Sequence, residues 1–118
     1  MSVGREAVLE RMYAAFNARQ VEAVLAAMAP DVAWPNGWEG GVVRGREAVG
    51  EYWRRQWAEI DPTVTPEAFE ALPDGRLAAS VRQVVCDRDG VTLSDQVVIH
   101  TYSFRDGLIA TMEIRKNP

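Results

Sequence analysis

The chain has 118 residues, of which 47% are hydrophobic and 25% are charged, and its formal net charge is -4 at pH 7. These proportions are typical of one folded domain spanning residues 1–118, and the negative charge argues against nucleic acid or an anionic membrane as a partner, because both bind basic patches. The single cysteine, Cys86, excludes an internal disulfide and a cysteine-built metal site. Because no apolar run approaches the roughly 18 residues that span a bilayer, we expect a cytoplasmic protein.

Three segments carry apolar residues at spacings of three and four, which predicts three amphipathic helices. The first runs from Arg5 to Arg19, and the second runs from Val21 to Met28 and is ended by Pro30. The third runs from Arg46 to Ile60 and is stopped by Asp61-Pro62. One face of this third helix carries Val49, Tyr52, Trp53, Gln56, Trp57 and Ile60.

A short strand, Val32 to Trp34, leads into the loop Pro35 to Gly41. The loop contains Trp38 and directly follows Trp34. Because two such large aromatic rings are not both expected to be exposed to water, we expect this loop to form the rim of a pocket. Asn36 and Glu39 either point into that pocket or cap turns of the loop, and the turn interpretation is favoured.

From Thr63 onward the pattern favours strands, and we expect an antiparallel meander of three or four. The strands are Thr65 to Leu72, Leu77 to Asp87, and a long hairpin from Leu93 to Ile114 that turns at Arg105-Asp106-Gly107. Helices followed by antiparallel strands predict an α+β fold in which a curved sheet wraps around the helices.

The alternation of side chains divides the long hairpin into two faces. His100, the only histidine of the chain, lies on the inner face, which also carries Gln96, Val98, Tyr102, Phe104, Met112 and Ile114. The outer face carries Val97 and Ile99, which form an apolar patch together with Val84. A homodimer formed through this convex face of the sheet is the simplest explanation for the patch.

Four segments together resemble the nuclear transport factor 2-like superfamily, and within it the SnoaL-like and ketosteroid isomerase-like proteins. They are Tyr13-Ala-Ala-Phe-Asn17, Ala29-Pro-Asp-Val-Ala-Trp34, Gly45-Arg-Glu-Ala-Val49 and His100-Thr-Tyr-Ser-Phe-Arg-Asp-Gly-Leu-Ile109. The resemblance implies a cone-shaped α+β barrel, with an apolar pocket between the three N-terminal helices and the concave sheet, usually in a homodimer.

The resemblance does not imply one function, because the superfamily contains isomerases, dehydratases, epoxide hydrolases, cyclases, transport factors and binding proteins. Ketosteroid isomerases use a tyrosine on the first helix, an acid on the long strand and an aspartate after the first strand. The corresponding residues here are Met12, His100 and Asn36 or its neighbour, although Tyr13 lies one residue from the first. Standard steroid isomerase activity is therefore not expected.

His100 is the main candidate catalytic residue, because imidazole both accepts and donates protons and burial among aromatic rings would keep it neutral. Tyr13, Gln83 or Tyr102 would then polarise a substrate oxygen. The alternative is a core histidine satisfied by one hydrogen bond from Gln83 or Tyr13. Gln83 stands among valines and needs a partner, either His100 or a ligand. Asp95 is excluded as the partner of His100, because it lies on the opposite face.

We expect the pocket to bind a small apolar or aromatic molecule, without a cofactor or a metal ion. The expected lining is Phe16, Trp34, Trp38, Trp53, Trp57, Val85, Val98, Tyr102, Met112 and Ile114. One interpretation is a lyase, isomerase or cyclase that acts on a carbonyl-bearing substrate by general acid/base chemistry. The alternative is a dimer that binds an apolar molecule without converting it, and a third is a protein-interaction module that uses the tryptophan loop.

Overall fold

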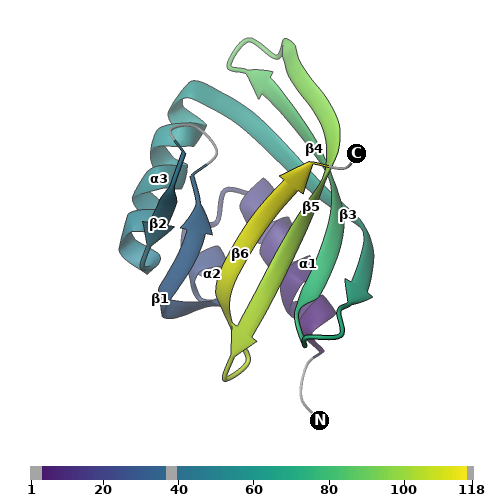
Figure 1. Ribbon diagram of the computed structural model, residues 1–118. Helices are drawn as coiled ribbons and strands as arrows, with labels where there is room; N and C mark the ends of the chain where they lie inside the picture. Colours follow the sequence, from purple (N-terminus) through teal and green to yellow (C-terminus); the bar gives the residue numbers. More distant parts are fainter. Residues whose placement is uncertain (1–3, 37–39, 117–118) are drawn as a thin grey trace.

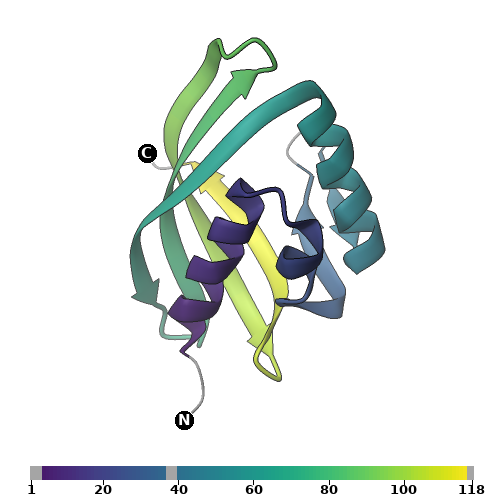
Figure 2. The same cartoon turned by 180° about the vertical axis from the view of Figure 1, so that it is seen from behind.

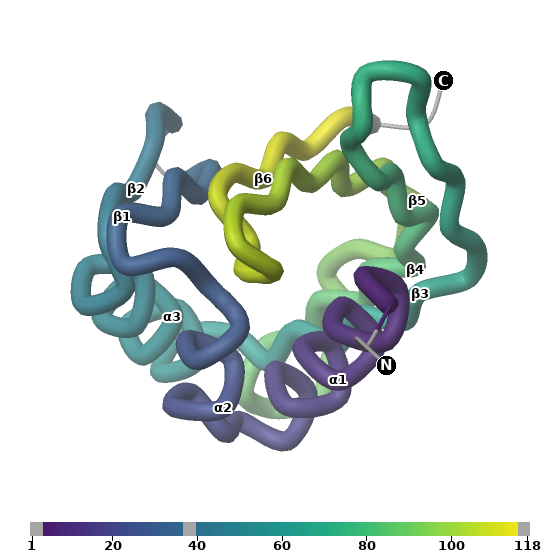
Figure 3. The backbone as a smooth tube through the Cα atoms, turned by 90° about the horizontal axis from the view of Figure 1, so that it is seen from below, coloured from purple at the N-terminus to yellow at the C-terminus, as the bar shows by residue number. Residues whose placement is uncertain are grey.

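The computed structural model describes residues 4–36 and 40–116, in which one curved sheet has helices against its inner side (Figure 1, Figure 2). In order along the chain, the elements are α1 (Arg5–Asn17), α2 (Val21–Leu25), β1 (Met28–Pro35), β2 (Val42–Arg44), α3 (Arg46–Glu59), β3 (Ile60–Ala71), β4 (Leu77–Asp87), β5 (Thr92–Arg105) and β6 (Leu108–Lys116). Figure 3 shows the sheet and the three helices surrounding a common interior. The predicted α+β class, a curved sheet wrapped around three N-terminal helices, is confirmed.

The long hairpin predicted from the sequence is formed by β5 and β6. Its turn lies at Asp106 and Gly107, which both have positive φ angles, 56° and 79°. Two consecutive residues with positive φ form the tight turn whose twist matches that of the flanking strands. The register pairs His100 with Ile114 and Tyr102 with Met112, so the inner-face residues of the two strands lie opposite one another.

The sheet is larger than the predicted meander, with the strand order β2-β1-β6-β5-β4-β3. β1 pairs in parallel with β6, and β2 folds back antiparallel on β1. β1 begins at Met28, four residues before the predicted strand, because pairing with β6 competes successfully with helix propensity in this segment. The predicted continuation of the second helix to Met28 is therefore wrong, and α2 ends at Leu25.

α1 ends at Asn17 instead of the predicted Arg19. Arg19 has a left-handed φ of 61°, its N–H donates to the carbonyl of Phe16, and the N–H of Gln20 donates to the carbonyl of Ala15. These two bonds form a Schellman motif, which satisfies carbonyls at the end of the helix. The Asn17 side chain then links α1 to β3 through two hydrogen bonds to the backbone of Val64, of 2.8 and 2.9 Å.

β3 starts at Ile60, directly after α3, and continues through Glu67-Ala-Phe-Glu-Ala71, a segment whose residues favour helix. It is one of the two edge strands in the described sheet and pairs only with β4 among the described strands. An edge strand tolerates the prolines at positions 62 and 66, since one side of its backbone needs no ladder partner. Pairing with β4 outweighs the local helix propensity.

The interior is apolar and continuous from the helices to the sheet. Its largest fully buried side chains include Leu9, Met28, Leu77, Tyr102 and Ile109. Burying each such side chain contributes roughly 1.5 to 3 kcal/mol, which far exceeds the contribution of any exposed ion pair. None of the described helices is both long and apolar enough to pass through a membrane.

Candidate functional site

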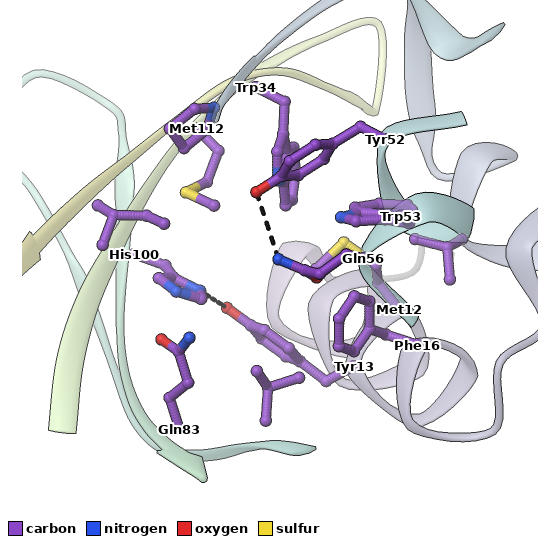
Figure 4. Close-up of a pocket in the computed structure, with 14 residues that line it drawn as sticks. Met12, Tyr13, Phe16, Trp34, Tyr52, Trp53, Gln56, Gln83, His100 and Met112 are labelled. Carbon is purple, nitrogen blue, oxygen red and sulfur yellow. Dashed lines mark hydrogen bonds between the residues drawn. The ribbon is translucent and has the colours of Figure 1, made fainter. Parts of the chain in front are cut away.

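A pocket lies between the helices and the inner face of the sheet (Figure 4). α1, α3, β4, β5 and β6 all contribute side chains to its wall. The lining residues are Met12, Tyr13, Phe16, Val24, Trp34, Pro35, Tyr52, Trp53, Gln56, Val64, Gln83, His100, Met112 and Ile114. With the open space at its mouth included, the hollow measures about 600 Å³.

A chain of three hydrogen-bonding groups lies at the sheet side of this pocket. The hydroxyl groups of Tyr102 and Tyr13 are 2.6 Å apart, and the Tyr13 hydroxyl is 2.9 Å from Nδ1 of His100 (Figure 4). Tyr102 also lies 3.4 Å from the same nitrogen. All three residues are buried, with exposed fractions of 0%, 3% and 5% for Tyr102, Tyr13 and His100. Tyr13 therefore supplies the expected hydrogen bond to the histidine.

Counting protons in this chain assigns the histidine tautomer. If Nδ1 accepts, Tyr102 donates to Tyr13, Tyr13 donates to His100, and each hydroxyl proton has an acceptor. If Nδ1 carried the proton, three donors would share two acceptors, and one buried O–H would remain unpaired at a cost of about 1 to 3 kcal/mol. The neutral imidazole therefore carries its proton on Nε2, on the side of the ring away from Tyr13.

Burial keeps all three groups neutral. It lowers the pKa of His100 from 6.5 to about 4 and raises the pKa of both Tyr13 and Tyr102 above that of an exposed tyrosine. At neutral pH the histidine is therefore an uncharged hydrogen-bond donor through Nε2. It offers no free lone pair to the pocket, so this arrangement favours polarisation of an oxygen over removal of a proton.

The other polar groups of the lining are amides and a phenol. Gln56 donates a hydrogen bond to the Tyr52 hydroxyl over 3.3 Å (Figure 4). Gln83 lies opposite Val64 in the sheet and lines the pocket, where its amide makes no hydrogen bond within the described part of the chain. Of the two partners considered for Gln83, His100 or a ligand, His100 is not bonded to it. In the strand register His100 pairs with Ala79 instead.

Asp95 lies on the outer face of the sheet, as predicted. Its carboxylate accepts two hydrogen bonds from Arg82, at 2.9 and 2.6 Å, and this arginine lowers the pKa of the aspartate. It is therefore no partner for the histidine. The described lining contains no aspartate or glutamate, while Glu39 lies outside the described residues. Asn36 is held in the loop by backbone hydrogen bonds to Gly40 and Gly41.

The aromatic residues divide into those that line the pocket and those that support the lining. Trp34 and Trp53 line it and meet edge to face at 5.3 Å between ring centres, and Phe16 packs against Trp53 at 5.5 Å. Trp57 stacks behind Trp53 at 6.2 Å and is not part of the lining. Its indole N–H is buried without a hydrogen-bond partner among the described residues.

Several predicted lining residues do not reach the cavity. Val98 and Tyr102 are core residues that are 1% and 0% exposed and do not belong to the lining. Val85 is half-buried near the end of β4 and lies outside the lining. Trp38 falls outside the described residues. Phe16, Trp34, Trp53, Met112 and Ile114 lie in the pocket wall.

Six lining residues were not among those predicted to line the pocket: Met12, Val24, Pro35, Tyr52, Gln56 and Val64. Tyr52 and Gln56 could have been found, since they lie on the same helix stripe as Trp53. Met12 was aligned with the tyrosine of the isomerases, whereas Tyr13 supplies the hydroxyl beside His100. The described residues include no group of three or more His, Cys, Asp or Glu side chains that could hold a metal ion.

Comparison with solved structures gives matches over nearly the whole chain. Rv0760c from Mycobacterium tuberculosis, in complex with estradiol-17beta-hemisuccinate, is 26% identical, with a TM-score of 0.81 over 94% of this chain and 92% of that one. TerC, co-crystallised with polyporic acid, is 25% identical, with a TM-score of 0.82 over 96% and 91%. A Delta 5-3-ketosteroid isomerase from Mycobacterium sp. shares the fold at 22% identity, with a TM-score of 0.82 over 98% and 95%.

Comparison with the curated proteins gives no match. The model of the SnoaL-like domain matches residues 9–112, which include most of the first helix, His100 and every lining residue of the pocket except Ile114. Proteins of this fold include a ketosteroid isomerase and proteins solved with small ligands. The chain therefore belongs to the SnoaL-like domain family.

Proposed function

We propose that the pocket binds a small, largely apolar molecule through its carbonyl group, and that His100 polarises this carbonyl in a reaction of the isomerase, lyase or cyclase type. The observation that carries the proposal is the hydrogen-bond chain Tyr102–Tyr13–His100, which leaves the Nε2 proton as the donor available to a ligand. Tyr13 and Tyr102 are positioning residues in this scheme, since they fix the tautomer and the orientation of the ring.

A neutral imidazole suits this task because it donates without bringing a charge into the apolar interior. When the bond between the α-carbon and its proton breaks, negative charge develops on the carbonyl oxygen. The Nε2–H is then a preorganised donor in a site of low dielectric constant, where one such donor typically accelerates a reaction about 10² to 10³-fold. Since the described lining has no carboxylate, the base that accepts the carbon proton in this scheme is a water molecule from the solvent at the mouth, and the enol is protonated again from solvent.

A second candidate function is binding without conversion. It is favoured by the absence of any aspartate or glutamate from the described lining, together with the low pKa of His100, because neither leaves a strong base near the substrate. Complexes of relatives with estradiol-17beta-hemisuccinate and polyporic acid support a small-ligand site of either kind.

Exchange of α-protons separates these two functions. The methyl ketone 2-acetylnaphthalene, labelled with ¹³C at its carbonyl, is incubated with the protein in D₂O. A downfield shift of the bound carbonyl signal with accelerated deuterium uptake supports carbonyl activation, and the same shift without uptake supports the binder. Both effects should be lost in His100→Ala and retained in Glu113→Ala, a change on the outer face. A bound ketone whose carbonyl signal is the same with and without His100 contradicts the proposal.

We also propose that two copies associate through the outer face of the sheet. Val84, Val97 and Ile99 are half-buried on this face, beside a hollow whose lining includes Thr101 and Arg115. A solvent-facing sheet surface with three adjacent β-branched apolar residues is suited to a self-complementary contact.

A further inference from the structure

The pocket is small for a ligand site. The space in which the centre of a water molecule can lie is about 100 Å³. One water needs roughly 10 to 15 Å³ of such space, so the pocket has room for about seven to ten waters. Each water occupies about 30 Å³ in the liquid, so these waters correspond to about 200 to 300 Å³ of solvent. At the packing density of organic crystals, this volume holds a molecule of roughly 10 to 15 non-hydrogen atoms, which is one ring or two fused rings.

The walls resist enlargement on the helix side. Trp53 is 2% exposed and is held between Trp34, Phe16 and Trp57, with ring centres 5.3 to 6.2 Å away. Moving one of these rings would disturb several aromatic contacts, each of which contributes about 0.5 to 1.5 kcal/mol beyond its buried area. The flexible parts of the wall are the thioether side chains of Met12 and Met112.

The described lining also lacks charge. It contains no Asp, Glu, Lys or Arg from any of the elements that surround the cavity, and the titratable groups that face His100 are the neutral hydroxyls of Tyr13 and Tyr102. An anionic ligand would therefore be buried without a cation unless the histidine took up a proton. A neutral oxygen acceptor fits the Nε2 donor without this cost.

We infer that the ligand is an uncharged carbonyl compound of one or two rings, and that the pocket discriminates against both carboxylates and four-ring molecules. The inference rests on the proposed role of His100 for the position of the carbonyl, while the limits on size and charge come from the whole lining. It separates this chain from a relative that holds the steroid ester estradiol-17beta-hemisuccinate.

Three probe molecules test the inference on the unmodified protein. 2-Acetylnaphthalene and 2-naphthoate have the same rings and nearly the same size and differ in charge, and progesterone is a four-ring ketone. Dissociation constants are measured at pH 7.5 by calorimetry and by quenching of tryptophan fluorescence. The acetylnaphthalene should bind at least tenfold more tightly than the naphthoate, and progesterone should show no saturable binding up to its solubility limit.

The pH dependence provides an independent readout. Naphthoate affinity should rise toward tenfold for each pH unit between 7.5 and 5.5, with uptake of about one proton per ligand bound, whereas the affinity for acetylnaphthalene should stay constant. Equal binding of ketone and carboxylate at pH 7.5, or tight binding of progesterone, would overturn the inference.

A cavity-enlarging variant tests the size limit directly. Met112 lines the pocket and is 5% exposed, whereas its neighbour Glu113 lies on the outer face. Met112→Ala should gain affinity for progesterone, and the matched control Glu113→Ala should not. A folded Met112→Ala protein that excludes progesterone as the wild type does contradicts the size argument. If this variant does not fold, the wild-type comparison of the three probes still decides.

The variant His100→Gln tests the proposed role of His100 separately from the proposed class of ligand. If it leaves ketone binding unchanged while size and charge selection persist, the proposed role of His100 fails and the ligand class stands. If it weakens ketone binding but progesterone binds best to the wild type, the ligand class fails and the role of His100 stands.

Discussion

Acidification should destabilise the protein through its single histidine. The pKa of His100 is about 4 in the folded chain, against 6.5 for an exposed histidine. As the pH falls below 6.5, the unfolded chain takes up a proton that the folded chain does not, so the free energy of unfolding decreases. The stabilisation is complete above pH 6.5, is lost progressively down to pH 4, and changes no further below that value.

The magnitude follows from these two pKa values. The complete loss is about 3 kcal/mol, at 1.36 kcal/mol for each tenfold change in proton affinity. Linkage gives about 2 kcal/mol at pH 5 relative to pH 7.5. This is a large share of the roughly 5 to 15 kcal/mol that holds a domain of this size folded.

Urea denaturation at pH 7.5 and pH 5 measures this loss, with His100→Gln as the control. The variant keeps a polar side chain but cannot titrate, so its stability should fall by about 2 kcal/mol less than that of the wild type over the same interval. Carboxylates such as Asp95, whose pKa the neighbouring Arg82 lowers, contribute equally to both proteins. Equal losses in the two proteins would refute the reasoning.

Nuclear magnetic resonance gives a second readout that needs no variant. Because the chain has one histidine, its ring signals are unambiguous. They should not titrate between pH 7.5 and 5, and the ¹⁵N shifts should place the proton on Nε2. A titration midpoint near 6.5, or a proton on Nδ1, would contradict the hydrogen-bond chain drawn for Tyr13 and Tyr102.

Three further predictions follow from named contacts. Tyr13→Phe should lower the free energy of unfolding by about 1 to 3 kcal/mol, and by more than Tyr102→Phe does. Only Tyr13→Phe leaves both the buried Tyr102 hydroxyl and Nδ1 of His100 without a good partner. Chemical denaturation measures the order of the two losses, and the reverse order would contradict this prediction. Trp57→Phe should destabilise the fold by less than Trp53→Phe, because Trp57 is only half-buried, whereas Trp53 is 2% exposed and packs against three aromatic rings; equal losses of stability in thermal unfolding would refute this. Ile99→Arg should shift a dimer to monomers in analytical ultracentrifugation, and a wild type that sediments as a monomer at high micromolar concentration would exclude the outer-face dimer.

Local chemistry and side-chain periodicity are enough to predict the elements on which the two agree. Alternation of side chains placed His100, Met112 and Ile114 on one face and excluded Asp95 from it, because the period of a strand leaves no other choice without a bulge. The Asp106-Gly107 turn was predictable for the same reason, since few residue pairs adopt two consecutive positive φ angles.

Contacts between segments that are distant in the sequence could not be predicted from local patterns. The parallel pairing of β1 with β6 converts the residues around Met28 from helix to strand, and no local pattern encodes that competition. The sequence also did not predict which residues of one strand face reach the cavity. His100 lines the cavity, whereas Val98 and Tyr102, on the same face, are buried in the core. Residues of one strand face can differ in whether they reach the cavity, so periodicity identifies the face but not the position at which the pocket opens. The histidine tautomer, finally, could be assigned only from the contact between Nδ1 of His100 on β5 and the Tyr13 hydroxyl on α1, 2.9 Å away.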